Sequence, residues 1–436
     1  MNRSKTLTEV VESRLCIGCG ACAALSKGGD VRLWDFPLEG IRPVVNDPAT
    51  EDWRRNAEIC PAIETDFSIS GATATEPGGP NSVGDAAFVR DWGRVLEVWE
   101  GHASDPEIRF KGSSGGALTA IAAYCLEKAG MHGVLHTAQH PENPVRNQTR
   151  LSRTRAELIA ATGSRYSPAS VCDSLDQVEQ APAPCVVVGK PGEIAAVTKA
   201  RKLLPALDAR VGVTLSFFCA ESPSTGGTIA LLEKMGVKPD NVADLRYRGY
   251  GWPGHFAPTR KGESEPCGKI PYRDSWKFLQ SFRPWSVHLW PDGTGELADI
   301  SCGDPWYEKP DGENPGFSLI AVRTEKGRQI IKAAMDAGYL KLTPAEPWKL
   351  VKSQQYLANK KAATWGRMFA MQLFGMAVPH FKGAPLFRCW LSLPFKEKAK
   401  SVFGTARRIF QRKLYRPLRL DRENAYAVEG RKNSSR

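Results

Sequence analysis

The sequence has 436 residues, of which 42% are hydrophobic and 24% are charged, and its net charge is +12 at pH 7. With a mean hydropathy of −0.34, this composition excludes a polytopic membrane protein, and the length predicts two domains with appendages. The first residues contain no apolar stretch of signal-peptide length, so we expect a cytoplasmic protein whose eleven cysteines are metal ligands or buried thiols rather than disulfides.

Composition divides most of the chain into three segments. Residues 1–70 carry four cysteines and are predicted to form a small metal-organised module, called here the cysteine module. Residues 71–82 are rich in Pro and Gly and are predicted to be a linker. Residues 83–345 alternate between helix and strand patterns, which predicts a mixed α/β body in two halves, about 83–170 and 175–345.

The cysteine module contains three cysteines at intervals of three, Cys16, Cys19 and Cys22, and Cys60 stands directly before a proline. Two-residue spacers let one loop place three thiolates around a [4Fe–4S] cluster, and a remote Cys-Pro can supply the fourth ligand. The sequence therefore predicts one cluster held by these four cysteines. A zinc site is the alternative, but zinc favours paired C-x2-C knuckles over a triplet.

A second cluster is not expected beside the first. In bacterial sequences of the type C-x2-C-x2-C-x3-C-P, the last cysteine ligates the other cluster. Here Ser26 stands at that position, and Lys27 replaces the proline. Gly18 and Gly20 lie within the cysteine run and are expected to let the backbone approach the cluster sulfurs closely.

The body begins with an apolar helix pattern that opens at Ser and Gly residues and closes at Gly130. The predicted elements, in chain order, are a helix at 114–130, a strand at 132–138, a strand–turn–helix unit at 184–204, strands at 210–220 and 295–301, and a strand–helix unit at 317–338. This alternation is typical of an α/β sheet protein.

Residues 346–436 form a basic, partly amphipathic extension. Its uncharged stretch 368–381 is interrupted by Pro379 and is too short for a transmembrane helix, which takes about 17–25 residues. We expect a helix packed on the body, with a position in a membrane interface as the alternative. Residues 396–436 carry 13 Lys/Arg against 4 Asp/Glu. Such a charged segment is usually solvated. A membrane surface is a possible contact for it, and nucleic acid is not an expected partner.

The segment KGSSGGALTA (111–120) offers consecutive N–H groups and a lysine at a helix N-terminus, which suits a pyrophosphate, although it is neither a Walker A loop nor a dinucleotide fingerprint. In order with ATGSRYSP, CVVVGKPGEIAAV, LSFFCAESPS, YRGYGWPG and PDGTGELADISCGDPW, it resembles the coenzyme F420 hydrogenase/dehydrogenase beta subunit family, which also includes 7-hydroxymethyl chlorophyll a reductase. The resemblance covers about residues 10–345 and implies an N-terminal ferredoxin-like [4Fe–4S] module joined to an FAD-binding α/β body.

The resemblance also implies a set of flavin contacts. These are Lys111, Gly112, Ser113, Ser114, Gly115, Gly116, Thr119, Ser164, Arg165, Tyr166, Lys190, Tyr247, Arg248 and Gly249. Each has an ordinary alternative: a glycine as a turn residue, an arginine as an ion-pair partner, a tyrosine as a core aromatic. His255 and His288 are candidate proton donors near the flavin, although a histidine beside aromatic residues is more often structural.

Two positions depart from the family pattern. Relatives often have a cysteine after the G-x-P turn, where this chain has Gly192, and a C-x2-C before P-D, where residues 285–292 read WSVHLWPD. Cys219 and Cys302 remain, but two scattered thiols do not make a four-ligand site. The expected inventory is therefore one [4Fe–4S] cluster and one FAD.

The function implied by the resemblance is that of an iron–sulfur flavoprotein oxidoreductase. Electrons would pass between the cluster and FAD, with coenzyme F420, ferredoxin or a reducible small molecule as the other partner. Two alternatives stay open: a noncatalytic electron-transfer subunit of a larger redox complex, and an accessory reductase in polysaccharide biosynthesis.

Overall fold

The computed structural model describes residues 6–26, 30–47, 53–68, 83–310 and 315–428, so the predicted linker 71–82 lies outside the described residues. One mixed sheet of eight strands organises the body in the order β14-β4-β13-β12-β8-β7-β5-β6. Its strands are β4 (Glu97–Ala103), β5 (Val134–Gln139), β6 (Asn147–Ser152), β7 (Cys185–Gly189), β8 (Val211–Phe217), β12 (Ile300–Gly303), β13 (Ser318–Val322) and β14 (Leu340–Pro344). Strands β5, β7, β8 and β12 run parallel and the outer pairs antiparallel, which confirms the predicted mixed α/β class.

Helices cover both faces of this sheet. One face packs against α6 (Ala117–Glu127) and α13 (Glu325–Asp336), and the other against α8 (Leu175–Glu179), α9 (Pro191–Leu203) and α10 (Pro205–Arg210). Strand β7 is buried along its whole length, which explains its continuous apolar sequence CVVVG. The remaining body elements are α4 (Ala86–Trp92), α5 (Pro106–Lys111), α7 (Arg155–Ala160), α11 (Thr225–Lys234), α12 (Tyr272–Leu279), the strands β9 (Val242–Arg246), β10 (His255–Arg260) and β11 (Ile270–Pro271), and 3-10 turns η3 (Val171–Ser174), η4 (Pro239–Asn241), η5 (Gln280–Phe282) and η6 (Trp285–His288).

The predicted body elements are present, with one error. The strand expected at 295–301 begins at Ile300 instead. The Asp292 carboxylate accepts hydrogen bonds from the backbone N–H groups of Thr294, Gly295 and Glu296, at 2.8–2.9 Å. These bonds fold the preceding residues into a turn, because an Asx side chain competes with the strand ladder for backbone donors.

The cysteine module consists of short elements. They are α1 (Leu7–Glu12), α2 (Ala21–Ala24), β1 (Val31–Phe36), β2 (Gly40–Val45), α3 (Trp53–Ile59) and β3 (Glu64–Asp66). Its apolar side chains join cores that neighbouring segments complete: Cys19, Ala21 and Ile59 pack with the body, whereas Val10 and Leu15 pack with the extension. The body therefore packs against one part of the module and the extension against another.

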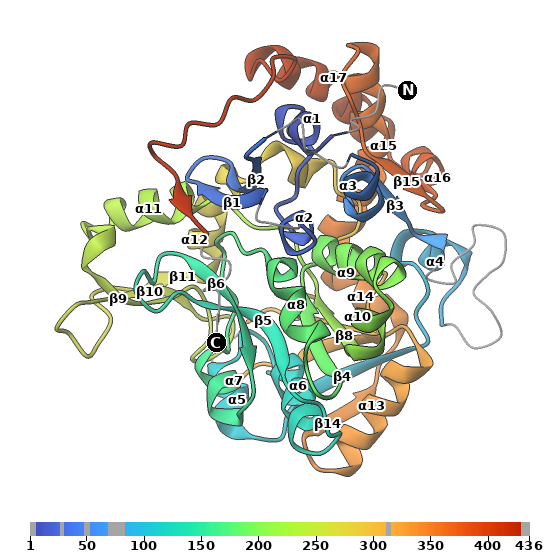
Figure 1. Cartoon of the computed structure of the whole chain (residues 1–436). Coiled ribbons are helices and arrows are strands. Elements are labelled where there is room, and N and C mark those ends of the chain that lie inside the picture. The colour runs from blue at the N-terminus through green and yellow to red at the C-terminus, as the bar shows by residue number, and fades with distance from the viewer. Residues whose placement is uncertain (1–5, 27–29, 48–52, 69–82, 311–314, 429–436) are drawn as a thin grey trace.

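The extension is folded and packs against the cysteine module (Figure 1). Its elements are α14 (Pro347–Ser353), α15 (Gln355–Leu373), β15 (His380–Lys382), α16 (Leu386–Leu391), α17 (Phe395–Gln411) and β16 (Tyr426–Ala427). Strand β15 pairs with β3 and strand β16 with β1. Within the uncharged stretch, Ala370 and Met371 are fully buried. None of the described helices combines the length and the apolar character that crossing a bilayer requires.

Candidate functional site

The four predicted ligand cysteines lie near one another. The segment that runs from the end of α1 through α2 carries Cys16, Cys19 and Cys22. Cys60 comes directly after α3. Burial raises the pKa of the Cys19 and Cys22 thiols, and the neighbouring cysteines raise it further. Burial and the charge of Cys16 likewise raise the pKa of Cys60 to about 11. Four thiols thus share one water-poor region.

Each of these sulfurs has a backbone N–H donor. Gly18 donates to Cys16 Sγ at 3.4 Å. The other donors are Ala21 to Cys19, Ala23 to Cys22, and Ala62 and Ile63 to Cys60. Hydrogen bonds of this kind stabilise thiolates, and they surround the ligand sulfurs of iron–sulfur clusters. In the described residues no three His, Cys, Asp or Glu side chains are arranged to hold a metal ion as they stand, but the donor set itself fits a cluster.

The two glycines of the run serve close backbone packing. Gly18 has φ +73°, and a Cβ there would lie 2.7 Å from the carbonyl oxygen of Ile41. Gly20 has φ +87°, and a Cβ there would lie 2.9 Å from the backbone nitrogen of Asp173. The predicted reason, approach to the sulfurs, is therefore incomplete: glycine also lets the loop lie against β2 and against η3 of the body.

The positions that lack further cysteines have other contacts. The Ser26 hydroxyl accepts a hydrogen bond from the backbone N–H of Val31 at 3.2 Å, at the start of β1. A Cβ on Gly192 would lie 2.6 Å from Cδ1 of Ile17. The space that a side chain at 192 would need is thus occupied by the cysteine loop itself.

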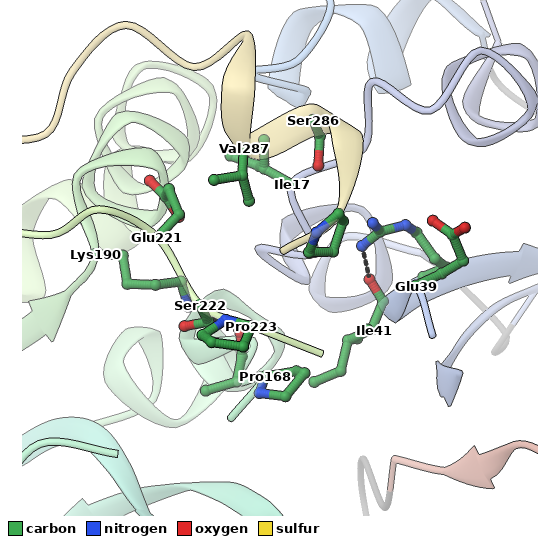
Figure 2. A pocket seen from close by; sticks show the side chains of 15 residues that line it. Ile17, Glu39, Ile41, Pro168, Lys190, Glu221, Ser222, Pro223, Ser286 and Val287 are labelled. Carbon is green, nitrogen blue, oxygen red and sulfur yellow. Dashed lines mark hydrogen bonds between the residues drawn. The ribbon is translucent and has the colours of Figure 1, made fainter. Parts of the chain in front are cut away.

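A cavity lies between the cysteine loop and the body, and we call it the loop cavity (Figure 2). It is lined by Ile17, Gly18, Glu39, Gly40, Ile41, Arg42, Pro168, Ala169, Lys190, Glu221, Ser222, Pro223, Pro284, Ser286 and Val287. Its volume is about 30 Å³, enough for about two water molecules. Ile17 and Gly18 stand between two predicted cluster ligands, so the cavity adjoins the cluster site directly.

Arg42 brings a buried positive charge to the loop cavity. Its side chain is 3% exposed, and one guanidinium nitrogen donates to the Ile41 carbonyl oxygen at 2.7 Å. Nε has no hydrogen-bond acceptor, and among the described residues no carboxylate lies within salt-bridge distance of this arginine. The charge of Arg42 also acts on the buried Asp35, where it offsets part of the rise in pKa that burial causes. The unbonded Nε leaves one donor available to a ligand.

Lys190, a predicted flavin contact, lines the same cavity but is already engaged. It pairs with the buried Glu193, and its Nζ also donates to the Ala169 carbonyl oxygen at 3.0 Å. Burial by itself would lower the pKa of Lys190, but the charges of Glu193 and Glu221 outweigh burial and raise it. The lysine is therefore held as a cation at the wall of the cavity.

Glu221 is a cavity residue that the sequence reading did not single out, although it lies in the matched block LSFFCAESPS. It has φ +73°, an uncommon conformation for a non-glycine residue, and its Oε1 is buried without a hydrogen-bond partner. Burial raises the pKa of its carboxyl, and Lys360 and Lys190 offset part of this rise. Burial also lowers the pKa of Lys360, on α15 of the extension, to about 8. The extension thus supplies a charge near this wall.

The glycine–serine loop, residues 111–116, lies at the start of α6. Its side chains have protein partners: Lys111 pairs with Glu107 at 2.8 Å, Ser113 accepts from the backbone N–H of Ser164 at 2.5 Å, and Ser114 donates to the Phe317 carbonyl oxygen at 2.6 Å. The backbone N–H of Gly115 donates to the Ser318 hydroxyl at 3.0 Å. Gly116 caps α6 with φ +72°, and Thr119 lies in the first turn of that helix, partly exposed.

Other predicted flavin contacts lie around this loop. A Cβ on Gly249 would lie 2.3 Å from the Lys111 carbonyl oxygen, so this glycine lets the two loops touch. Arg248 pairs with Asp304 at 2.7 Å and lies over the rings of Tyr272 and Trp306. The ordinary alternative for Arg248, a surface ion-pair partner, is right about the ion pair, but Arg248 is 4% exposed and therefore buried.

Arg165, Tyr166 and Tyr247 form a second group behind the loop. The Arg165 guanidinium donates to Asn147, Gln139 and three backbone carbonyl oxygens. Its plane lies over the Tyr247 ring at 5.3 Å, and the Tyr166 ring packs edge-on against Tyr247 at 5.9 Å. The structure therefore gathers most predicted contacts near the glycine–serine loop and places Lys190 separately, at the loop cavity.

The two histidine candidates differ in environment. His255 is exposed at the start of β10. His288 is half-buried beside Trp285, and burial, together with Arg367 and Arg283, lowers its pKa to about 2. Its imidazole is therefore neutral at pH 7.

Comparison with known proteins assigns most of the body to two family models, both of the coenzyme F420 hydrogenase/dehydrogenase beta subunit. The model of its N-terminal part matches residues 98–176, and the model of its C-terminal part matches residues 184–347. Together they span more than half of the chain. The loop cavity combines walls from these matched regions with Ile17 and Arg42, which lie before them.

Individual relatives carry related names. A coenzyme F420 hydrogenase subunit beta from Methanococcus voltae is 27% identical over 298 residues, covering 66% of this chain and 99% of the relative. A coenzyme F420-dependent sulfite reductase from Methanocaldococcus jannaschii is 22% identical, covering 75% of this chain and 47% of the relative. A chain of the F420-reducing [NiFe] hydrogenase complex from Methanosarcina barkeri has the same fold, with a TM-score of 0.52 and 21% identity over 66% of this chain and 96% of that chain.

Proposed function

This chain belongs to the coenzyme F420 hydrogenase/dehydrogenase beta subunit family, and from that premise we propose that it is an electron-transfer oxidoreductase with one [4Fe–4S] cluster and one FAD. Cys16, Cys19, Cys22 and Cys60 hold the cluster. Coenzyme F420, ferredoxin or a partner subunit exchanges electrons with the protein. The names of the relatives, F420 hydrogenase subunits and an F420-dependent sulfite reductase, support the redox role.

The observation that carries this proposal is the loop cavity. It brings a buried guanidinium, whose Nε has no hydrogen-bond acceptor, next to the loop that carries three of the four cysteines. A cluster and a second redox group need such adjacency, because electrons transfer efficiently only over short distances. Neither a zinc knuckle nor a solvated tail accounts for the charge of Arg42 at this place.

The residues available to FAD form a continuous path. The N-terminus of α6, which the glycine–serine loop precedes, is suited to a pyrophosphate, although the N–H groups of Gly112 and Gly115 already donate to Ile108 and Ser318. Residues 164–169 run from that loop to the loop cavity, where Lys190 contacts Ala169. Usual ligand pockets measure about 300–1,000 Å³, whereas the loop cavity measures about 30 Å³. A flavin ring would therefore enter the cavity only if the cysteine module and the body separate locally.

FAD, when bound, converts between single electrons and hydride. The chain's own residues set the conditions for that exchange. Arg42 provides a fixed positive charge that stabilises an electron-rich ring, and Lys190 adds a second cation. Glu221 is positioned to hold a proton at its free Oε1, since its pKa is raised. The packed walls exclude water and strengthen these charges.

A second candidate is a noncatalytic electron-transfer subunit. It is favoured by the match to 99% of a relative that is itself named a subunit, and by the structural relative that was solved within a hydrogenase complex. In that case the substrate reacts on another chain, and this protein only relays electrons between cluster and flavin.

One experiment tests both candidates. The full chain is purified without oxygen, and iron, sulfide and flavin are quantified with its absorption spectrum. We expect about four irons and one FAD per chain, and oxidation of reduced F420 by a one-electron dye in the presence of this chain alone. If the chain contains both cofactors but does not oxidise reduced F420, it has the relay role. If it contains one zinc ion instead of iron, or has no chromophore, the proposal is overturned.

A further inference from the structure

Exposed apolar side chains are concentrated on the extension. Nine of the sixteen exposed large hydrophobic residues in the described chain lie between residues 369 and 415. We call their surface the aromatic–basic face; its apolar members are Phe369, Leu373, Phe374, Phe387, Leu391, Phe395, Phe403, Phe410 and Tyr415. Soluble monomers rarely expose such a group without a partner.

Helix α17 has two sides: an exposed side with three phenylalanines, which belongs to this face, and a buried side. Phe395, Phe403 and Phe410 are 85%, 74% and 58% exposed, and at 3.6 residues per turn they fall within an arc of about 80°. Ser401, Thr405 and Ile409 form the buried side that packs toward α15. Phe395 and Phe403 are therefore largely exposed to solvent, and Phe410 is more than half exposed.

Neighbouring helices extend the apolar surface. The Phe374 ring, at the end of α15, lies 5.1 Å from Phe410, and Phe410 lies 6.3 Å from Tyr415. Trp365 stacks on Phe369 at 5.2 Å and contacts Phe387 of α16 at 4.8 Å. Two groups of contacting rings therefore lie on the extension, one where α15 ends beside α17 and one between α15 and α16.

Cations border the phenylalanine arc. On the wheel of α17, Lys396, Lys400 and Arg407 follow directly beside it, and all three are exposed. Arg412 and Lys413 continue the border beyond the helix. Between residues 385 and 420 the sequence contains one acidic residue, Glu397. An apolar centre with a basic rim is complementary to an anionic lipid surface.

We propose that the aromatic–basic face binds the surface of a membrane containing anionic lipids, with α17 lying in the plane of the headgroups. Leucines such as Leu373, which is 64% exposed, cannot stack on nucleic-acid bases, and the three α17 cations lie along one edge of the phenylalanine arc. A protein partner would more often meet a surface depleted of lysine. The lipid surface accounts for both features.

Membrane binding through this face would orient the molecule. Ile409 of α17 and the nearby Leu414 share one apolar cluster with Cys16, Val10 and Leu15 of the cysteine module. Figure 1 places α17 beside that module and α13 at the opposite end of the molecule. The cysteine module would then face the lipid, and the far end of the body would face solvent.

Vesicle co-sedimentation of the full anaerobically purified chain tests the proposal. The probes are phosphatidylcholine vesicles and phosphatidylcholine vesicles with about a third phosphatidylglycerol. We expect binding to the anionic vesicles, weakened about fivefold for each charge removed in the triple variant Lys396→Gln/Lys400→Gln/Arg407→Gln, and at least tenfold in Phe395→Ser/Phe403→Ser.

Matched controls use residues distant from the face. Leu38→Ser removes an apolar side chain that is 74% exposed in the cysteine module, and Lys326→Gln/Lys332→Gln/Lys341→Gln removes three exposed charges from the opposite end of the body. Both should bind like the unaltered chain. Equal loss in the controls, no preference for anionic vesicles, or a dimer that Phe395→Ser/Phe403→Ser abolishes would each overturn the proposal, the last by assigning the face to a second copy.

Discussion

The glycine–serine loop, which was expected to bind a cofactor, and the loop cavity, which only the structure revealed, differ in the state of their polar groups. At the glycine–serine loop, Ser113, Ser114 and the Gly115 N–H already have protein partners. At the loop cavity, Arg42 Nε and Glu221 Oε1 are buried without partners. A satisfied loop can be explained by folding alone, whereas a buried polar atom without a partner has a desolvation cost that a bound ligand could offset.

This contrast also ranks the cysteines. The thiols of the module share a water-poor region that raises the pKa of three of them. Cys267, by comparison, donates its S–H to the Pro258 carbonyl oxygen and has no cysteine neighbour among its described contacts. Because several neighbouring thiols can ligate one metal centre together and a lone thiol cannot, the module cysteines are expected to bind metal and Cys267 is not.

The most severe test removes one proposed ligand. Cys60→Ser is expected to abolish the cluster, because a hydroxyl replaces the remote thiolate while the remaining loop supplies three ligands. Iron should fall from about four per chain to below one, and the visible charge-transfer absorption should disappear. Cys267→Ser is the matched control and should keep its iron. Full iron in Cys60→Ser would show that another residue is the fourth ligand.

The next test asks whether the ion pair between Arg248 and Asp304, near the glycine–serine loop, stabilises the folded chain. Arg248→Met leaves the Asp304 carboxylate, 17% exposed, without its guanidinium. Breaking such a pair typically costs about 3–5 kcal/mol; we expect about 3 here, since Trp252 still donates to Asp304.

Urea denaturation of the anaerobically purified chain measures this loss. The control is Arg260→Met, which breaks an exposed pair with Glu263 and should change the free energy of unfolding by less than about 1 kcal/mol. Equal effects in the two variants would mean that Arg248 is not a structural ion-pair partner.

A subtler test concerns the unpaired charge in the loop cavity. Arg42→Gln removes a cation that would stabilise a reduced, electron-rich flavin, so the two-electron midpoint potential of the bound FAD should fall by about 30 mV, or about 1.4 kcal/mol. Arg32→Gln, an exposed arginine on β1, is the matched control. An unchanged potential with flavin still bound would remove Arg42 from the site without affecting the assignment of the cofactor.

The last expected effect is a pH dependence of stability. His288 has a pKa of about 2 in the folded chain against about 6.5 when unfolded. The unfolded state therefore binds the additional proton, and stability is complete above pH 6.5 and declines as the pH falls, by up to about 1.4 kcal/mol per unit. Urea denaturation at pH 7, 6 and 5 should show a shallower decline in His288→Asn than in the control His255→Asn. Parallel slopes would contradict the buried, neutral state of His288.

Local sequence signals predicted much of the body correctly. The run CVVVGKPGEIAAV gave a strand, a turn and a helix because apolar continuity, a Gly-Lys-Pro turn and helix-forming residues all agree there. The strand expected from Gly295 failed because Asp292 binds three backbone N–H groups. That competition depends on the side chain's position and cannot be read from apolar alternation.

The extension shows a second limit. Its charge and aromatic residues were evident in the sequence, but the pairing of β15 with β3 and of β16 with β1 was not. Each pairing joins short strands separated by hundreds of residues, and strands of two or three residues carry almost no periodicity. Likewise, nothing in GIRPVV indicates that Arg42 is 3% exposed or that its Nε has no hydrogen-bond acceptor.

What the sequence by itself determined is the chemistry available: four cysteines at cluster spacing, a phosphate-suited loop, and a family resemblance across the body. The tertiary structure decided which of these groups are already satisfied. It brought Arg42, Lys190 and Glu221 from three distant segments to one cavity beside the cysteine loop. The physical reason is that residue types and spacing are local properties, whereas burial and hydrogen-bond partners depend on how distant segments pack.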